Sequence, residues 1–160
     1  MKLEEVVKLN KPIVLVFGRL CSGKGTYCAP YEEQGYLHIT TSDVVRGLSG
    51  AQTRDKLQHT KDFDEAIGER MVELIYEHKM VIIDGIRQNK IVDRIVDEFG
   101  DNVQMIWLEV PADIRKERFR KRGAAKDDQS FEDAERGDTN LGLDDVEAKY
   151  RPQSRVVHNY

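Results

Sequence analysis

Small residues and a lysine between Gly18 and Thr26 have the spacing of a loop that binds phosphate. Gly18 is followed by four residues and then by Gly23 and Lys24, the core of a Walker A loop, with Gly25 inserted before Thr26. Such a loop aims backbone N–H groups at an anion, while the lysine reaches the β- and γ-phosphates and the threonine hydroxyl helps to hold Mg²⁺. The competing interpretation is a glycine-rich turn with an ordinary surface lysine. We expect the loop to bind ATP, because an apolar strand precedes it and a helix follows.

Charged residues follow other predicted strands, where they would face the same ligand. Asp84 ends an apolar strand, the Walker B position from which a carboxylate contacts Mg²⁺ directly or through water. The alternative is that Asp84 starts a turn with Gly85. Arg46 and Arg87 come just after strand ends, where a bidentate guanidinium can hold a phosphate, although both could be plain solvated charges. The pattern predicts a Mg²⁺ ligand at Asp84 and phosphate contacts at both arginines.

A predicted helix after Pro111 carries a run of basic residues, and such a run is most often a solvated face. Arg118 and Arg122 lie one turn apart on it, so both can face one ligand. We select these two as candidates for binding and expect the other basic residues of the helix to be solvated.

Asp43 has three interpretations that the sequence leaves open. A phosphate acceptor is already ionised near neutral pH and needs no base. A hydroxyl acceptor gains from a carboxylate that takes its proton, and Asp43 would be that base. Asp43 could also simply cap a helix that begins at Val44. Its role therefore depends on the acceptor.

Short apolar runs alternate with helical patterns along the chain. A continuous apolar run before Gly18 predicts a central strand that is buried on both faces. The predicted strands cover 12–17, 36–39, 80–83, 103–110 and 155–158, and the predicted helices cover 24–33, 62–78, 88–99, 111–122, 131–136 and 143–150. This alternation predicts a three-layer α/β fold, in which a parallel sheet of about five strands binds ligands at its carboxyl ends.

Composition narrows the classes of function. The 160 residues carry a formal net charge of −4, which disfavours a protein that coats nucleic acid through bulk positive charge. No apolar run approaches the roughly 20 residues that cross a bilayer, and residues 1–11 lack an export signal, so we expect a cytoplasmic protein without a membrane partner. Cys21 and Cys28 are expected to be free thiols. No transition-metal site is expected, because the histidines lack ligand spacing: His38, His59, His78 and His158.

The Gly-Lys-Gly-Thr form of the loop resembles that of adenylate kinase and related nucleoside monophosphate kinases. Residues 41–46 resemble the family's Thr-Gly-Asp-hydrophobic-hydrophobic-Arg segment, and residues 84–87 resemble its Asp-Gly-Phe-Pro-Arg with one residue fewer. Residues 110–122 contain Val-Pro followed by two arginines four apart, as in the family. Residues 128–136 run from an aspartate to an arginine at the family's spacing of eight. The resemblance extends over 13–136 in the family's order and implies a P-loop kinase fold.

Together with the loop chemistry, the resemblance implies a set of roles. The catalytic residues would be Lys24, Asp43, Arg122 and Arg136, with the two arginines neutralising the transferring group. ATP would be bound by Gly18, Cys21, Ser22, Gly23, Lys24, Gly25, Thr26 and Arg118, the last of these against the base. Mg²⁺ would be held by Thr26 and Asp84. The acceptor would contact Asp43, Arg46, Arg87 and Gln88, with both arginines on its phosphate.

The sequence therefore predicts an ATP- and Mg²⁺-dependent kinase with a nucleotide-type acceptor, in the first place a nucleoside monophosphate. One domain, 1–160, would hold an acceptor-binding insertion at 41–79 and a short lid at 119–142. The alternative acceptor is a hydroxyl group of dephospho-coenzyme A, of a nucleoside or of a 5-hydroxymethyl pyrimidine in DNA, with Asp43 as base. A different class is a switch that hydrolyses nucleotide slowly, for which Gln88 is the only candidate near Asp84 to orient water. Nucleic acid enters only as a substrate, and the oligomeric state is left open.

Overall fold

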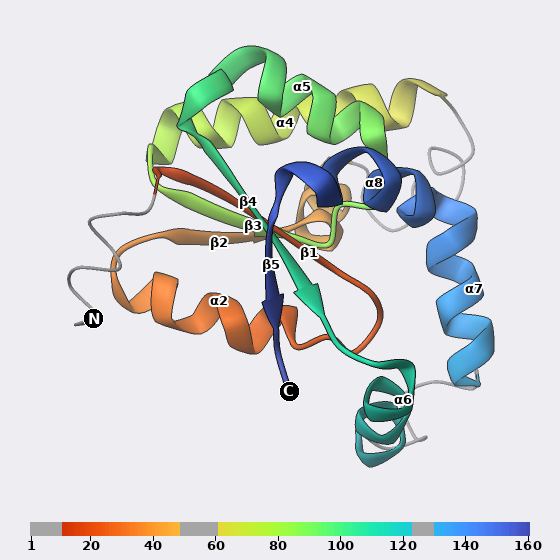
Figure 1. Ribbon diagram of the computed structural model, residues 1–160. Helices are drawn as coiled ribbons and strands as arrows, with labels where there is room; N and C mark the ends of the chain where they lie inside the picture. The colour runs from red at the N-terminus through yellow and green to blue at the C-terminus, as the bar shows by residue number, and fades with distance from the viewer. Residues whose placement is uncertain (1–10, 49–60, 123–129) are drawn as a thin grey trace.

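The computed structural model describes residues 11–48, 61–122 and 130–160, and a five-stranded sheet forms its centre (Figure 1). The strands lie in the order β2-β3-β1-β4-β5, and every neighbouring pair is parallel. Their bounds are β1 (Ile13–Gly18), β2 (Leu37–Thr40), β3 (Val81–Asp84), β4 (Val103–Glu109) and β5 (Arg155–His158). β1 is buried along its full length, as a central strand covered on both faces should be. The predicted α/β fold with a parallel sheet of five strands is confirmed.

Helices cover both faces of the sheet and its carboxyl end (Figure 1). One face carries α2 (Lys24–Glu33), and the other carries α4 (Lys61–His78), α5 (Asn89–Phe99) and α8 (Leu143–Tyr150). The helices α6 (Ala112–Lys121) and α7 (Phe131–Leu141) stand beyond the carboxyl ends of the strands. Residues 41–48, directly after β2, are also helical, and the short 3-10 turns are η1 (Gly100–Asn102) and η2 (Arg151–Gln153). The sheet and its two helical coverings form the three predicted layers.

Side chains of β1 alternate between two apolar cores, one on each face of the sheet. Leu15 and Phe17 belong to the larger core, which contains residues of α4, α5 and α8. Val14 and Val16 point to the opposite face and pack in a smaller core with Cys28 of α2. This alternation is the ordinary period of a strand, and it identifies which residues of the neighbouring strands face α2.

The register of the sheet brings two polar side chains to the α2 face. Asp84 pairs with Val16 of β1 and with Thr40 of β2, and His38 of β2 pairs with Ile82 of β3. Val16 and Ile82 both belong to the core on the α2 face. Since paired residues share a face, Asp84 and His38 also face α2. Asp84 is the last residue of β3 and therefore lies at the carboxyl edge of the sheet.

Nearly every predicted element lies within one residue of its expected bounds, and α7 is the exception. It was expected to end at residue 136 but continues to Leu141. Gly137 does not end the helix, because the left-handed residue that does so is Gly142, with a φ of 116°. Ser130 caps the start, where its hydroxyl accepts the Asp133 N–H at 3.2 Å.

The helix after β2 begins sooner than expected. It starts at residue 41 and not at Val44, because the Thr40 hydroxyl accepts the Asp43 N–H at 3.1 Å. Thr40 is therefore the cap, and the interpretation of Asp43 as the capping residue is wrong. Asp43 lies instead in the first turn, while Val44 and Val45 are buried in the core.

Parts of two predicted segments lie outside the described residues. The acceptor-binding insertion at 41–79 includes residues 49–60, and the short lid at 119–142 includes residues 123–129. Both segments stay predictions, as does the single domain over 1–160. In the part of the chain that the structure describes, no helix has the length and apolar character that crossing a membrane requires.

Candidate functional site

The loop between β1 and α2 is so crowded that it requires small residues. Cys21 and Gly23 have a left-handed backbone, with φ values of 62° and 87°. A side chain on Gly18 would overlap the Ser22 hydroxyl, and a Cβ on Gly23 would lie 2.6 Å from the amide nitrogen of Asn159. Glycine therefore fits at both positions. The bare backbone leaves room for an anion to approach, as the Walker A spacing predicts.

The loop opens onto a hollow of ≈ 450 Å³, which we call the loop cavity. Sites for small molecules typically measure roughly 300 to 1,000 Å³, so this volume suits such a ligand. Most residues that the sequence assigned to ATP and Mg²⁺ lie together here. The lining consists of Leu20, Cys21, Ser22, Gly23, Lys24, Gly25, Thr26, Asp84, Arg87, Arg118 and Arg122.

Lys24 lies against the loop in which it is predicted to contact the phosphates. Its Nζ donates to the carbonyl oxygens of Gly18 and Arg19 at 3.1 and 3.3 Å. Burial lowers the pKa of Lys24, and the charge of Arg87 lowers it further, although Asp84 acts in the opposite direction. A phosphate in the loop cavity would place an opposite charge beside this ammonium group and would stabilise its charged form.

Arg118 ties the loop to the end of the chain. Its guanidinium donates to the carbonyl oxygens of Cys21 at 3.2 Å and of Asn159 at 2.7 Å. The Asn159 side chain in turn donates to the carbonyl oxygen of Ser22 at 2.8 Å. Sequence reasoning missed Asn159, since nothing local indicates that the residue after β5 reaches the loop. Arg118 lines the loop cavity, and its contact with an ATP base stays a prediction.

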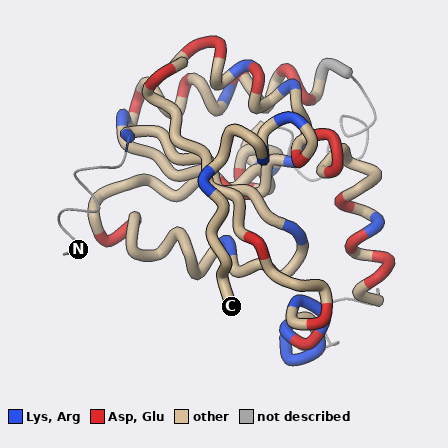
Figure 2. Tube along the Cα trace, viewed as in Figure 1, with Lys and Arg blue, Asp and Glu red and all other residues tan. Residues whose placement is uncertain are grey.

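Lysine and arginine residues are concentrated along α6 (Figure 2), and Arg118 of this helix lines the loop cavity. Arg122, just after this helix, lines the cavity, and its guanidinium lies 5.6 Å from the centre of the Phe119 ring. Arg115 differs, because it is buried and pairs with Glu135 of α7. The expectation that the remaining basic residues are solvated is therefore wrong for Arg115, which joins the two helices.

A second hollow of ≈ 140 Å³, which we call the small cavity, shares one lining residue with the loop cavity. That residue is Arg87. Two polar atoms of the lining, Thr41 Oγ1 and Gln88 Oε1, are buried without a hydrogen-bond partner among the described residues. Burial raises the pKa of Asp64 in the same lining. Because buried polar groups are normally satisfied, the small cavity suits a polar ligand. Its lining consists of Thr41, Ser42, Val45, Phe63, Asp64, Ile67, Gly85, Arg87, Gln88 and Leu141.

Asp43 and Arg46 do not join this arrangement. They form an ion pair with each other on the surface of the helix at 41–48, and their side chains are 55% and 61% exposed. The bonds to Thr40 and Arg46 lower the pKa of Asp43. Within the described residues, neither side chain lines the loop cavity or the small cavity. Their predicted contacts with an acceptor therefore stay predictions that this geometry does not support.

Arg136 also lies apart from the loop cavity. It is exposed, pairs with Asp133 one turn away at 2.9 Å, and lines a different hollow together with Arg19 and Arg115. Asp128, from which its spacing was counted, lies outside the described residues. The structure thus brings Lys24 and Arg122 together at the loop cavity, but it does not bring Arg136 there.

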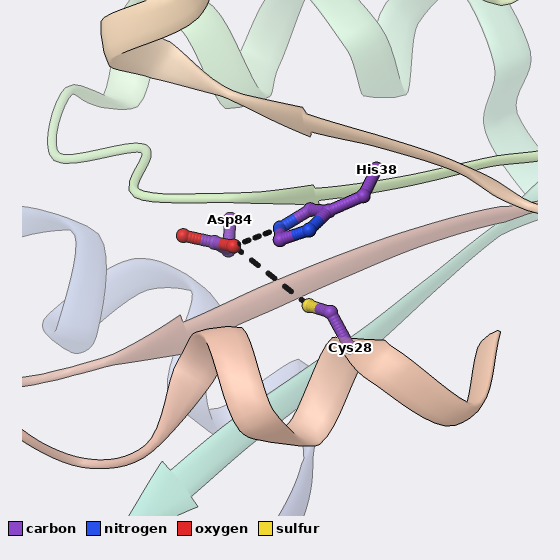
Figure 3. A group of neighbouring side chains, drawn as sticks. All are labelled: Cys28, His38 and Asp84. Atoms are coloured by element: carbon purple, nitrogen blue, oxygen red, sulfur yellow. Dashed lines mark hydrogen bonds and ion pairs between the residues drawn. The ribbon is translucent and has the colours of Figure 1, made fainter. Parts of the chain in front are cut away.

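Asp84 has two polar neighbours on the α2 face of the sheet (Figure 3). Its Oδ2 shares a hydrogen bond with His38 Nε2 and accepts a weak one from Cys28 Sγ at 3.8 Å. The Asp84 side chain is only 12% exposed, and these contacts come in addition to its place before Gly85. Sequence reasoning missed both neighbours, because their proximity follows from the register of β2 and β3 and from the packing of α2.

The loop cavity fits a nucleotide with Mg²⁺. Ser22 Oγ is buried without a hydrogen-bond partner among the described residues, and a phosphate oxygen in the loop would satisfy it. Lys24 supplies positive charge beside it. Thr26 and Asp84 line the same cavity and offer the oxygen ligands that Mg²⁺ prefers.

Comparisons with known sequences agree with this site. A family model described as an AAA domain matches residues 14–139. A UPF0200/UPF0201 protein of Archaeoglobus fulgidus is 30% identical over 81% of this chain and 45% of its own length. A UPF0200 protein of Thermococcus onnurineus is 30% identical over 79% of this chain and 76% of its own length. The chain thus spans less than half of the first relative and about three quarters of the second.

Two solved structures share the fold. A gluconokinase from Sinorhizobium meliloti has a TM-score of 0.60 over 94% of this chain and 84% of its own, at 17% identity. A shikimate kinase from Bacteroides thetaiotaomicron has a TM-score of 0.62 over 92% and 85%, at 12% identity. At these identities the similarity shows the fold alone, which is a P-loop kinase-like α/β fold. These comparisons do not specifically confirm the resemblance of the sequence motifs to nucleoside monophosphate kinases.

Proposed function

Because this chain belongs to the AAA domain family and to the UPF0200 proteins, we propose that it is a kinase. The kinase would transfer the γ-phosphoryl group of ATP. The kinase-like fold and the crowded Walker A loop support a phosphotransferase. As acceptor we propose a nucleoside monophosphate, following the resemblance of the loop and of residues 84–87 to such kinases.

The position of Arg87 is the observation that carries this proposal. Arg87 follows β3 and lines both the loop cavity and the small cavity. A donor in the first cavity and the phosphate group of an acceptor in the second would meet at its guanidinium, which can bind two phosphate oxygens at once. A protein that only binds or hydrolyses a nucleotide needs no second polar cavity at that point.

Charge neutralisation would provide most of the rate enhancement. Lys24, Arg87 and Arg122 reach the loop cavity from three different segments of the chain, so together they can surround a transferring group. Bound Mg²⁺, held by Thr26 and Asp84, would add positive charge at the phosphates. Because a monophosphate is already ionised near neutral pH, no side chain has to remove a proton from it.

A hydroxyl acceptor is the second candidate, and Asp64 is the residue that favours it. Asp64 lines the small cavity, and burial raises the pKa of its carboxyl group toward the range in which a general base is effective. Asp43, the base that the sequence suggested, is exposed and paired with Arg46. A kinase of a hydroxyl group would therefore use Asp64 in place of Asp43.

The position of Gln88 does not favour the hypothesis of a slow hydrolytic switch. A glutamine that orients the attacking water must reach the γ-phosphate over the loop. Gln88 lines the small cavity and, within the described residues, does not line the loop cavity. This position suits its other predicted role, contact with an acceptor.

The test is a screen for transfer of radiolabelled phosphate from ATP in the presence of Mg²⁺. The acceptors are nucleoside monophosphates, nucleosides, dephospho-coenzyme A and oligonucleotides that contain 5-hydroxymethyl pyrimidines, and Lys24→Ala is the inactive control. We expect label on a monophosphate. Label on a hydroxyl group alone would establish the second candidate. Release of inorganic phosphate with every acceptor would contradict the kinase and favour the switch.

A further inference from the structure

Cys28, His38 and Asp84 point toward one another from three elements (Figure 3). Cys28 lies on α2, His38 on β2 and Asp84 at the end of β3. One sulfur, one nitrogen and one oxygen atom of these side chains all lie within 4.8 Å of one another. We propose that the three residues, here called the Cys-His-Asp cluster, bind a borderline-soft divalent cation of the Zn²⁺ type.

The mixture of ligand atoms selects this class of cation. Mg²⁺ prefers oxygen ligands, whereas Zn²⁺ and Co²⁺ accept thiolate, imidazole and carboxylate together. Tetrahedral bonds of about 2.0 to 2.3 Å to Zn²⁺ separate neighbouring ligand atoms by about 3.3 to 3.8 Å. Cys28 Sγ and Asp84 Oδ2 are 3.8 Å apart, which matches that spacing. His38 Nε2 and Asp84 Oδ2 lie closer because they share a hydrogen bond, so a cation would separate these two atoms.

Glu32 supports the imidazole from outside the cluster. Its Oε1 lies 2.7 Å from His38 Nδ1, and since a carboxylate can only accept, Nδ1 carries the hydrogen. An imidazole that donates through Nδ1 presents Nε2 to a metal ion, and a carboxylate in this outer position is typical of zinc sites. Glu32 lies four residues after Cys28, on the same face of α2. One helix thus supplies both a ligand and the residue that orients another ligand.

The cluster is sheltered but can be reached. Cys28 is completely buried, whereas the side chains of His38 and Asp84 are 19% and 12% exposed. Asp84 also lines the loop cavity, so a cation can enter from there. Three protein ligands leave a fourth position of a tetrahedral cation for water.

Binding exchanges protons for the cation. The thiolate form of cysteine and an imidazole nitrogen without a proton are the forms that bind a metal ion, so Cys28 and His38 Nε2 bind the cation without a proton. The cation replaces the thiol proton of Cys28 and the proton between His38 and Asp84, and both are released to solvent.

The consequence for activity rests on the proposed function. Asp84 is also the proposed Mg²⁺ ligand of the nucleotide site, so a cation in the Cys-His-Asp cluster would compete for that carboxylate and inhibit transfer. Binding to the cluster requires no nucleotide and no turnover. It can therefore be measured independently of any kinase activity.

The test is a titration of the metal-free full chain with Co²⁺, without nucleotide, followed by absorption spectroscopy. A charge-transfer band from thiolate to cobalt reports a cysteine ligand, and intense d–d bands report four-coordinate metal. We expect one Co²⁺ per chain with both signals. Zn²⁺ should displace the Co²⁺, whereas a large excess of Mg²⁺ should not.

Variants assign the signal to residues. Cys28→Ser should abolish the charge-transfer band, and Glu32→Gln should weaken Co²⁺ binding about 10- to 100-fold, as loss of an outer partner typically does. Cys21→Ser, at the other free thiol, is the matched control and should leave band and affinity unchanged. Thermal unfolding, monitored by circular dichroism, verifies that each variant folds. If Cys28→Ser does not fold, the Co²⁺ affinity of Glu32→Gln decides whether the cluster binds the cation. Glu32 is exposed, so its replacement is compatible with the fold.

Two results would overturn the proposal. One is the absence of a charge-transfer band from the folded wild type at saturating Co²⁺. The other is a band that persists in Cys28→Ser and disappears in Cys21→Ser, which would place the cation in the loop. Failure of the acceptor screen would leave this binding result unchanged, and failure of Co²⁺ binding would leave transfer with Mg²⁺ unchanged.

Discussion

Arg87 Nε lies 2.7 Å from Asp138 Oδ1, and this ion pair joins the loop after β3 to α7. Asp138 is buried, and the Arg87 side chain is 33% exposed. The pair holds the guanidinium between the loop cavity and the small cavity, both of which Arg87 lines. Asp138 is therefore a positioning residue for the group at which donor and acceptor are proposed to meet.

Removal of the Asp138 charge should affect the acceptor more than ATP. We expect Asp138→Asn to lower kcat/KM for the acceptor by about 10-fold or more, because Arg87 loses the partner that fixes it. The KM for ATP should change by no more than about twofold. Steady-state kinetics with each substrate varied in turn provide the measurement. The control is Asp133→Asn, which removes the surface partner of Arg136. Equal losses of kcat/KM for ATP and for the acceptor in Asp138→Asn would contradict the assignment of Arg87 to the acceptor.

Replacement of Lys24 should abolish transfer and leave the fold intact. Lys24 contacts loop carbonyl groups and lies outside the apolar cores, so its main contribution is charge at the phosphates. We expect Lys24→Ala to lower single-turnover transfer by roughly 10²-fold or more. Lys90→Ala, at an exposed lysine of α5, should behave as wild type in the same assay. Wild-type turnover in folded Lys24→Ala would remove the Walker A assignment.

Two aspartate variants separate a phosphate acceptor from a hydroxyl acceptor. Asn keeps the size of Asp but cannot act as a base, so Asp64→Asn and Asp43→Asn isolate the chemistry from the fold. With a monophosphate, both variants should lower turnover only modestly. With a hydroxyl acceptor, Asp64→Asn should lower kcat by about 10²- to 10⁴-fold, and exposed Asp43→Asn should not. The opposite order of effects in single-turnover transfer would restore Asp43 as the base.

Thr40 should contribute to stability as the cap of the helix at 41–48. Its hydroxyl accepts the Asp43 N–H, and loss of such a cap typically costs about 1 kcal/mol of the free energy of unfolding. We expect Thr40→Ala to show this loss in urea unfolding, while Thr40→Ser retains most of the wild-type stability. Equal stabilities of the Ala and Ser variants would show that the bond contributes nothing measurable.

Local patterns in the sequence were sufficient for the order of the elements and for most of their bounds. The apolar run of β1 and the glycine-lysine spacing after it are both contained within a few residues, so they identify the strand, the loop and the start of α2. The loop cavity follows from these elements, because parallel strands present their carboxyl ends at one edge. Asp84 was placed correctly at this edge for the same reason.

Contacts that depend on register and helix packing could not be read from the sequence. His38 meets Asp84 because β2 pairs with β3 in one register, and a shift of one residue would turn it to the opposite face. The expectation that the histidines lack ligand spacing considered only distance along the chain. Cys28 of α2 and His38 of β2 come together through packing on the α2 face of the sheet. Asp138 was missed because α7 was expected to end before it.

The central claim is that a phosphoryl group passes from the loop cavity to the small cavity at Arg87. Its most direct test is single-turnover transfer of the labelled γ-phosphoryl group from ATP to the acceptor, by the wild type and by Arg87→Ala. We predict label on the acceptor with the wild type. At subsaturating acceptor we predict at least a tenfold slower transfer by Arg87→Ala, with a far smaller effect on the affinity for ATP. Label found only in inorganic phosphate, or transfer at the wild-type rate by Arg87→Ala, would contradict the claim.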